Sequence, residues 1–134
     1  MIRTARCACG ALSATAEGEP LRVAACSCSY CQRRSGSAFG LSAYWPAEAV
    51  TLAGEARSWR RVSQRGRDFE HFFCPTCGTA LWWRAAMKPE WIGLAAGAFA
   101  APDFPPPVAA VWDTGRYAWV RFPEDCEPLD EQLF

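Results

Sequence analysis

The sequence lacks an excess of charge of either sign, because its 14 lysines and arginines balance its 14 aspartates and glutamates. This balance argues against a nucleic-acid partner or an anionic-membrane partner, since either would require a basic face. The sequence also lacks an apolar run long enough to span a membrane, and its first residues contain no apolar core of a signal peptide. We therefore expect a cytoplasmic protein that binds neither nucleic acid nor membrane.

Histidine is scarce as well, because His71 is the only one among the 134 residues. Most metal ligands and catalytic groups must therefore come from other side chains. A lone histidine in a predicted strand is more often structural than catalytic, and we interpret His71 in that way. The length predicts a single domain over residues 1–134.

Cysteine, in contrast, is abundant, with eight residues. Seven of them form the motifs C-A-C-G, C-S-C-S-Y-C and C-P-T-C-G, which contain Cys7 and Cys9, then Cys26, Cys28 and Cys31, then Cys74 and Cys77. Thiolates this close can share one ion, because tetrahedral zinc with Zn–S bonds of about 2.3 Å holds its sulfurs roughly 3.8 Å apart. A redox dithiol or a buried apolar thiol would account for one pair but not for three clusters. Cys126 stands apart among acidic residues that disfavour its thiolate, and we interpret it as a bystander.

The seven clustered cysteines divide into four and three. Gly10 directly follows Cys9, and Gly78 directly follows Cys77, as suits a tight backbone turn beneath a metal ion. The first and last motifs are therefore expected to form one closed four-thiolate site. The middle motif has no such glycine and runs into a polar, cationic stretch, which favours an open three-thiolate site. If Cys26, Cys28 and Cys31 instead shared an ion with a donor from another cluster, the remaining cysteines would have no complete site.

Short strands punctuated by turns dominate the rest of the sequence, which predicts a mainly antiparallel β fold clamped by zinc. Ser29 is the predicted N-cap of one short helix over residues 30–34, after the central cysteine cluster. A turn at Gly54 predicts a hairpin between residues 50–52 and 57–62. Further strands are expected over residues 11–16, 21–26, 38–45, 68–73, 79–84, 91–94 and 117–122, with a proline-rich loop over 101–107.

These motifs resemble the glutathione-dependent formaldehyde-activating enzyme family. The resemblance rests on residues 7–10, on C-S-C-S-Y-C-Q-R-R-S-G-S-A-F at 26–39, on F-C-P-T-C-G-T-A-L at 73–81 and on the segment around 112–119. It implies an Mss4-like β-tent of stacked antiparallel sheets that holds two zinc ions. By this resemblance the structural ion is bound by Cys7, Cys9, Cys74 and Cys77, and the catalytic ion by Cys26, Cys28 and Cys31.

The family's name implies a carbon–sulfur lyase reaction in which glutathione adds to formaldehyde and gives S-(hydroxymethyl)glutathione. A thiolate from the substrate would complete the three-cysteine site and become a nucleophile at neutral pH. Arg33 and Arg34, with Ser35 and Gly36, follow the triad closely enough to bind the carboxylates of such a thiol. The alternative for the two arginines is an ordinary solvated surface position.

One departure from the family concerns the residue between the first two triad cysteines, which is histidine in many relatives and Ser27 here. The local motif therefore lacks an imidazole. Two other function classes stay open, a thiol carrier without turnover and a non-catalytic zinc-stabilised binding module. An exchangeable metal position would favour the enzyme or the carrier, and two equally inert ions would favour the module. Pocket walls are one use for Trp45, Trp82, Trp83 and Trp112, although core packing is the commoner use of tryptophan.

Overall fold

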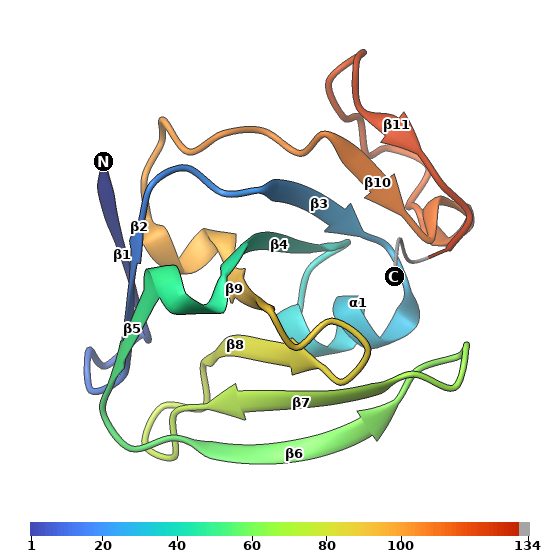
Figure 1. The fold of residues 1–134 in the computed structure, drawn as a ribbon. Coiled ribbons are helices and arrows are strands. Elements are labelled where there is room, and N and C mark those ends of the chain that lie inside the picture. The colour runs from blue at the N-terminus through green and yellow to red at the C-terminus, as the bar shows by residue number, and fades with distance from the viewer. Residues whose placement is uncertain (132–134) are drawn as a thin grey trace.

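The computed structural model describes residues 1–131, which form eleven strands, one α-helix and three short 3-10 helices (Figure 1). The strands are β1 (Ile2–Arg6), β2 (Ser13–Glu17), β3 (Arg22–Cys26), β4 (Gly40–Pro46), β5 (Val50–Ala53), β6 (Arg57–Val62), β7 (Asp68–Phe73), β8 (Ala80–Ala85), β9 (Trp91–Ala95), β10 (Ala109–Val111) and β11 (Glu127–Pro128). The helices are α1 (Ser29–Ser35), η1 (Ala47–Ala49), η2 (Ala96–Phe99) and η3 (Asp113–Gly115). None of the helices in this part of the chain is long and apolar enough to cross a bilayer.

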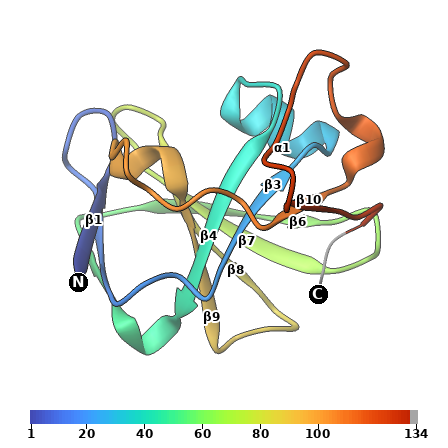
Figure 2. The ribbon, with the colours of Figure 1, turned by 90° about the horizontal axis from the view of Figure 1, so that it is seen from above.

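Two sheets make up the fold, which is mainly β as the sequence predicts. The small sheet has the order β1-β2-β5, and the large sheet has the order β11-β10-β3-β4-β9-β8-β7-β6. Neighbouring strands are antiparallel except where β10 pairs in parallel with β3 and with β11. Figures 1 and 2 show the small sheet standing across one end of the large sheet.

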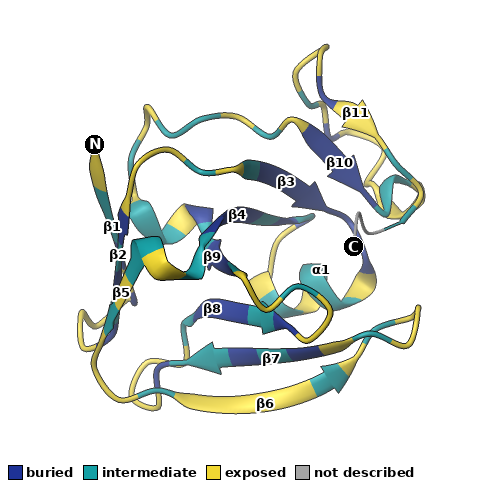
Figure 3. Cartoon of the chain, viewed as in Figure 1, coloured by how far each residue is buried: buried dark blue, intermediate teal, exposed yellow. Residues whose placement is uncertain are grey.

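The main core lies where the two sheets meet. Ala14 of β2 packs in one cluster with Trp45, Leu81 and Leu94 of the large sheet, and all four are fully buried. The indole Nε1 of Trp45 donates a hydrogen bond of 3.0 Å to the carbonyl of Gly18, so its polar atom is satisfied. Figure 3 shows that burial is concentrated in the middle strands of the large sheet, whereas its edge strand β6 is mostly exposed.

Strand β7 brings the chain's only histidine to the interior. Phe69 and His71 are buried, whereas Asp68 is exposed, as expected when successive side chains of a strand point to opposite faces. Trp83 of β8 lies opposite His71 in register. The ring of Tyr30 on α1 is 4.9 Å from the imidazole, centroid to centroid. His71 therefore occupies the face of the sheet that packs against α1.

The helix after the central cysteine cluster forms where the sequence predicts it, but its cap differs. Cys28, not Ser29, is the N-cap, and its Sγ accepts a hydrogen bond of 3.3 Å from the backbone N–H of Cys31. The helix ends at Gly36, which adopts a left-handed conformation with φ of 66°, as is common at a helix C-terminus. The helix is therefore capped by the thiol of a predicted metal ligand, Cys28, and not by the hydroxyl of Ser29.

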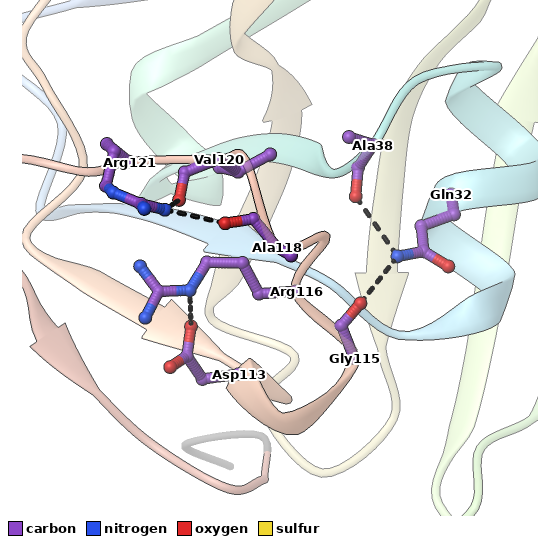
Figure 4. A network of polar contacts seen from close by, with 8 residues as sticks. All are labelled: Gln32, Ala38, Asp113, Gly115, Arg116, Ala118, Val120 and Arg121. Atoms are coloured by element: carbon purple, nitrogen blue, oxygen red, sulfur yellow. Dashed lines mark hydrogen bonds and ion pairs between the residues drawn. The ribbon is translucent and has the colours of Figure 1, made fainter.

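Two strand predictions are wrong. β5 and β6 flank Gly54 but do not form a hairpin, because β5 pairs with β2 and β6 pairs with β7. Gly54 instead packs so closely on the first turn that a Cβ there would lie 2.2 Å from the carbonyl oxygen of Ala11. Residues 117–122 form no strand. The guanidinium of Arg121 donates to the carbonyls of Ala118 and Val120 and closes a local turn (Figure 4).

Candidate functional site: two cysteine clusters and their cavities

The first cluster joins two turns that follow strands of different sheets. The Sγ atoms of Cys7, Cys9, Cys74 and Cys77 all lie within 4.8 Å of one another. Cys7 and Cys9 follow β1 of the small sheet, and Cys74 and Cys77 follow β7 of the large sheet. Four sulfurs at these distances can hold one metal ion and leave no coordination position free.

Each of the two turns is closed by a backbone hydrogen bond, and each places a polar group beside a sulfur atom. The N–H of Leu12 donates to Sγ of Cys7 at 3.2 Å. In the second turn, the hydroxyl of Thr79 lies 3.3 Å from Sγ of Cys77, and its hydrogen bonds lower the pKa of the Cys77 thiol to about 5. Gly10 and Gly78 have φ of 83° and 80°, which is the left-handed conformation that glycine adopts readily. The two cysteine-glycine turns therefore have the geometry that the sequence predicts.

The second cluster is local to the end of β3 and the start of α1. The Sγ atoms of Cys26, Cys28 and Cys31 lie within 4.8 Å of one another. Cys26 is the last residue of β3, Cys28 caps the helix and Cys31 lies in its first turn. The backbone N–H of Ser27 donates to the carbonyl of Val111 on β10 at 3.1 Å, which fixes the loop between them.

The electrostatics of this triad suit a cation. Hydrogen bonds from the Cys26 and Cys31 thiols to the Cys28 sulfur lower the pKa of Cys28 to about 2. The hydrogen bonds that Cys26 makes with Cys28 and Cys31, together with its burial, raise the pKa of Cys26. Three thiols this close cannot all ionise unaided, but a divalent cation removes that limit because coordinated thiols are deprotonated. Both donor sets therefore fit a thiophilic ion such as zinc.

A small cavity of about 30 Å³ lies beside the triad, within the space between α1 and the large sheet. Its walls include Cys26 and Cys31 of the triad and His71 of β7. Further lining residues are Ala24, Tyr30, Arg34, Ser42, Tyr44, Arg61, Phe69, Trp83 and Val111. Two cysteines of the triad thus face a small, partly enclosed space that is also lined by two arginines and one imidazole.

His71 is the residue of this cavity that sequence reasoning assigned only a structural place. Its burial, followed by the nearby charges of Arg61 and Arg34, lowers its pKa to about 3, so the imidazole is neutral. The Nε of Arg61 lies 3.4 Å from Nε2 of the ring and donates to it. The alternation of side chains along β7 could have predicted that His71 lies on a buried face. Its position beside the triad depends on the packing of elements that are distant in sequence.

A larger cleft of about 840 Å³ lies between the first cluster and α1. Its polar lining includes Arg6, Arg34, Ser35 and Thr79. Arg34 lines both this cleft and the small cavity, so it stands between the cleft and the triad. Its guanidinium carbon is 4.6 Å from the ring centroid of Trp83. A cleft of this volume is in the usual range for small-molecule sites.

The four predicted substrate-binding residues lie on two sides of α1. Arg34 and Ser35 face the large cleft, and the hydroxyl of Ser35 donates to the carbonyl of Cys31 at 2.7 Å. Arg33 and Gly36 line a separate groove of about 400 Å³ whose wall includes Trp119. The structure therefore does not bring the four residues together.

The four tryptophans named above also separate. Trp45 and Trp82 belong to the main core. Trp83 lines the small cavity, and Trp112 packs against the cluster that includes Cys26 and Cys28. Cys126 is buried, and its burial, with the charges of two nearby aspartates, raises the pKa of its thiol.

The segment that follows β10, here called the C-terminal segment (residues 112–126), packs on the triad loop and on α1. The side-chain amide of Gln32 donates to the carbonyl of Ala38 at 3.1 Å and to the carbonyl of Gly115 at 3.0 Å (Figure 4). Gly115 packs on the triad loop so closely that a Cβ would lie 2.3 Å from the carbonyl oxygen of Ser27. Ser27 is buried against this segment and does not line the small cavity.

Comparisons with known proteins agree with this geometry. No curated protein matches the chain. The crystal structure of a Rhodobacter sphaeroides protein superimposes on it with a TM-score of 0.58 at 21% identity, and the match covers 94% of this chain and 98% of that chain. This likeness supports the fold. The profile of the family described as glutathione-dependent formaldehyde-activating enzyme matches residues 2–115, which include both cysteine clusters. The chain therefore belongs to the glutathione-dependent formaldehyde-activating enzyme family.

Proposed function

We propose that this protein is a cytoplasmic carbon–sulfur lyase that joins glutathione to formaldehyde and forms S-(hydroxymethyl)glutathione. The observation that carries the proposal is the three-cysteine cluster beside a cavity. Three cysteines leave one of the four coordination positions of a tetrahedral zinc ion open. Family membership supports glutathione and formaldehyde as the small-molecule partners.

The two clusters have different tasks in this proposal. Cys7, Cys9, Cys74 and Cys77 hold a structural zinc, because four thiolates complete its coordination. Cys26, Cys28 and Cys31 hold the catalytic zinc. When bound, that ion supplies Lewis acidity that lowers the pKa of a substrate thiol. The backbone N–H of Cys31, which donates to Sγ of Cys28, keeps this sulfur in place at the helix N-terminus.

The large cleft is the proposed site of the rest of the thiol substrate. Glutathione carries two carboxylates, and the cleft offers the guanidinium groups of Arg6 and Arg34. Arginine suits carboxylates because its planar fork can form two parallel hydrogen bonds. Arg34 also lines the small cavity, so it connects the cleft with the triad. A thiol whose carboxylates bind in the cleft would therefore have its sulfur toward the triad.

The test uses cobalt in place of zinc, because thiolate binding to cobalt changes its charge-transfer spectrum. Glutathione should produce this change in the wild-type protein. Arg6→Glu should weaken glutathione by roughly tenfold, the loss expected for one charged hydrogen bond, and should leave mercaptoethanol binding unchanged. Arg33→Glu makes the same charge change on the other side of α1 and serves as the control. A greater loss in Arg33→Glu would point to the groove beside Trp119, and an equal loss in both variants would contradict binding in the cleft.

The rate of adduct formation separates the enzyme from the alternatives. The proposal predicts that the zinc-loaded protein accelerates the reaction of glutathione with formaldehyde above the uncatalysed rate. Binding without acceleration would leave a thiol carrier. No spectral response to any thiol would leave only a zinc-stabilised binding module and would contradict the proposal.

A further inference from the structure

His71 is held rigidly beside the triad cavity although it belongs to neither cysteine cluster. It is 4% exposed and is packed against the rings of Tyr30 at 4.9 Å and Trp83 at 6.0 Å, centroid to centroid. Its nitrogen atoms lie outside the group of sulfur atoms that can share an ion. A buried, oriented imidazole that is not grouped with the metal ligands requires another explanation.

The partner of one ring nitrogen fixes the tautomer. The Nε of Arg61 donates to Nε2 of His71 at 3.4 Å, and a guanidinium has no acceptor atom. Nε2 must therefore be the unprotonated nitrogen, and the proton of the neutral ring is on Nδ1. Arg61 is itself held in place, because its guanidinium carbon lies 3.8 Å from the ring centroid of Tyr30.

The protonated nitrogen has no protein partner. Among residues 1–131, Nδ1 of His71 is buried without a hydrogen-bond partner, and so is Nε of Arg34. Both residues line the same small cavity as Cys26 and Cys31. An unsatisfied buried donor costs about 1–3 kcal/mol, and an acceptor that enters this cavity would relieve that cost.

The size of the cavity limits that acceptor. Its volume is about 30 Å³, and a cavity needs roughly 10–15 Å³ to hold one water. The cavity therefore admits only a small group. A one-carbon carbonyl meets this limit, and its oxygen is an acceptor.

We propose that Nδ1–H of His71 binds the oxygen of the one-carbon aldehyde and stabilises the negative charge that develops on it. This inference rests on the proposed function. The thiolate sulfur attacks the carbonyl carbon, a C–S bond forms, and the π electrons of the C=O bond move to the oxygen. The oxygen then takes up a proton from water, which balances the proton that the thiol released on binding. His71 keeps its own proton throughout, since a neutral imidazole can act as a pure hydrogen-bond donor.

The motif of the triad itself offers no imidazole between its first two cysteines. Ser27 occupies that position and is buried against Gly115, away from the cavity. The imidazole here is supplied instead by His71 of β7, which lines the same cavity. A donor is therefore present although the local motif contains none.

The first test compares variants of the zinc-loaded protein. His71→Phe keeps a ring without a donor and should lower kcat/KM for adduct formation on the order of 10²-fold, the effect of losing one such donor. His71→Asn retains an N–H near the position of Nδ1 and should recover part of this loss. Phe72→Leu changes the packing of the same strand outside the cavity, against Trp82, and should have a small effect. Equal activity of wild type and His71→Phe would overturn the proposal.

The second test observes the ring directly. Because His71 is the only histidine, protein labelled with ¹⁵N-histidine has one imidazole signal set. The proposal predicts a neutral ring with the proton on Nδ1, and a downfield shift of that proton with glutathione plus formaldehyde but not with glutathione alone. A proton on Nε2 would overturn the proposal whether or not the protein binds thiols.

The cobalt spectrum distinguishes the remaining cases. His71→Phe should leave the spectrum of the thiol-free protein unchanged. A changed spectrum would show that His71 acts through the metal ligands, which would also overturn the proposal. A protein that binds no thiol but has the Nδ1–H tautomer would instead contradict the proposed function.

Discussion

Gly40, the first residue of β4, shows how closely single residues control the candidate site. A Cβ at this position would lie 2.6 Å from Nη2 of Arg34 and 3.1 Å from Cβ of Cys31. Gly40→Ala should therefore displace the Arg34 side chain while the strand persists. Because a hydrogen bond to a charged group is worth about 1.5–3 kcal/mol, displacing this guanidinium should make glutathione bind on the order of tenfold more weakly in the cobalt assay.

Gly97→Ala is the matched control for that substitution. Gly97 lines the same cleft but has open space around the position of a Cβ, so alanine there adds the same methyl group without displacing Arg34 and should weaken glutathione binding much less. Identical affinities in Gly40→Ala and Gly97→Ala would mean that the position of Arg34 does not govern thiol binding.

At the same scale, sequence reasoning succeeds where the signal is local. Cys9–Gly10 and Cys77–Gly78 predict their turns because glycine beside a metal ligand has a specific backbone meaning. His71 gives no such signal. Its neighbours in the site, Arg61 across the β6–β7 ladder and Tyr30 on α1, become neighbours only through long-range packing.

At the scale of elements, α1 and the C-terminal segment are fastened together by one side chain. Gln32 bridges the carbonyls of Ala38 and Gly115 (Figure 4). Gln32→Ala removes both hydrogen bonds, each worth about 1 kcal/mol, and should loosen the cover over the triad. We expect trypsin to cleave after Arg116 faster than in the wild type, with little change in the far-ultraviolet circular dichroism.

Ser29→Ala provides the comparison for this prediction, since Ser29 is an exposed residue of the same helix. It should be cleaved at the wild-type rate. If Gln32→Ala were also cleaved at that rate, the bridge would not hold the segment.

The elements themselves were predicted unevenly. β3, β4, β7, β8 and β9 carry runs of apolar or aromatic residues, and the sequence locates each of them within a few residues. The strand β10 is only three residues long and pairs in parallel with β3, which leaves no alternation to recognise. The prediction of a hairpin at Gly54 was wrong because a turn residue does not specify which sheet the next strand joins.

At the scale of the whole molecule, the two clusters differ in what they hold together. Cys9 and Cys74 lie 65 residues apart in sequence, and their Sγ atoms are 3.6 Å apart. This cluster therefore joins the small sheet to the large one, whereas the triad lies within one short segment. The kinship of the two-sheet arrangement with Mss4 stays a prediction.

This difference predicts opposite outcomes for two equivalent substitutions. Structural zinc contributes on the order of 10 kcal/mol to folding, comparable to the entire stability of a domain. Cys77→Ser should therefore unfold the chain, as measured by circular dichroism. Cys28→Ser should leave it folded but without a spectral response to thiols. Equal destabilisation by both variants would refute the distinction between a structural and an open site.

We propose that the chain holds two zinc ions, one enclosed by four thiolates and one bound by three. The most direct test is the zinc content per chain before and after mild chelation, with circular dichroism recorded on the same samples. We predict two zinc ions in the purified protein, and the loss of one with the fold intact. A single ion at the outset, or the loss of both ions together with unfolding, would contradict the account.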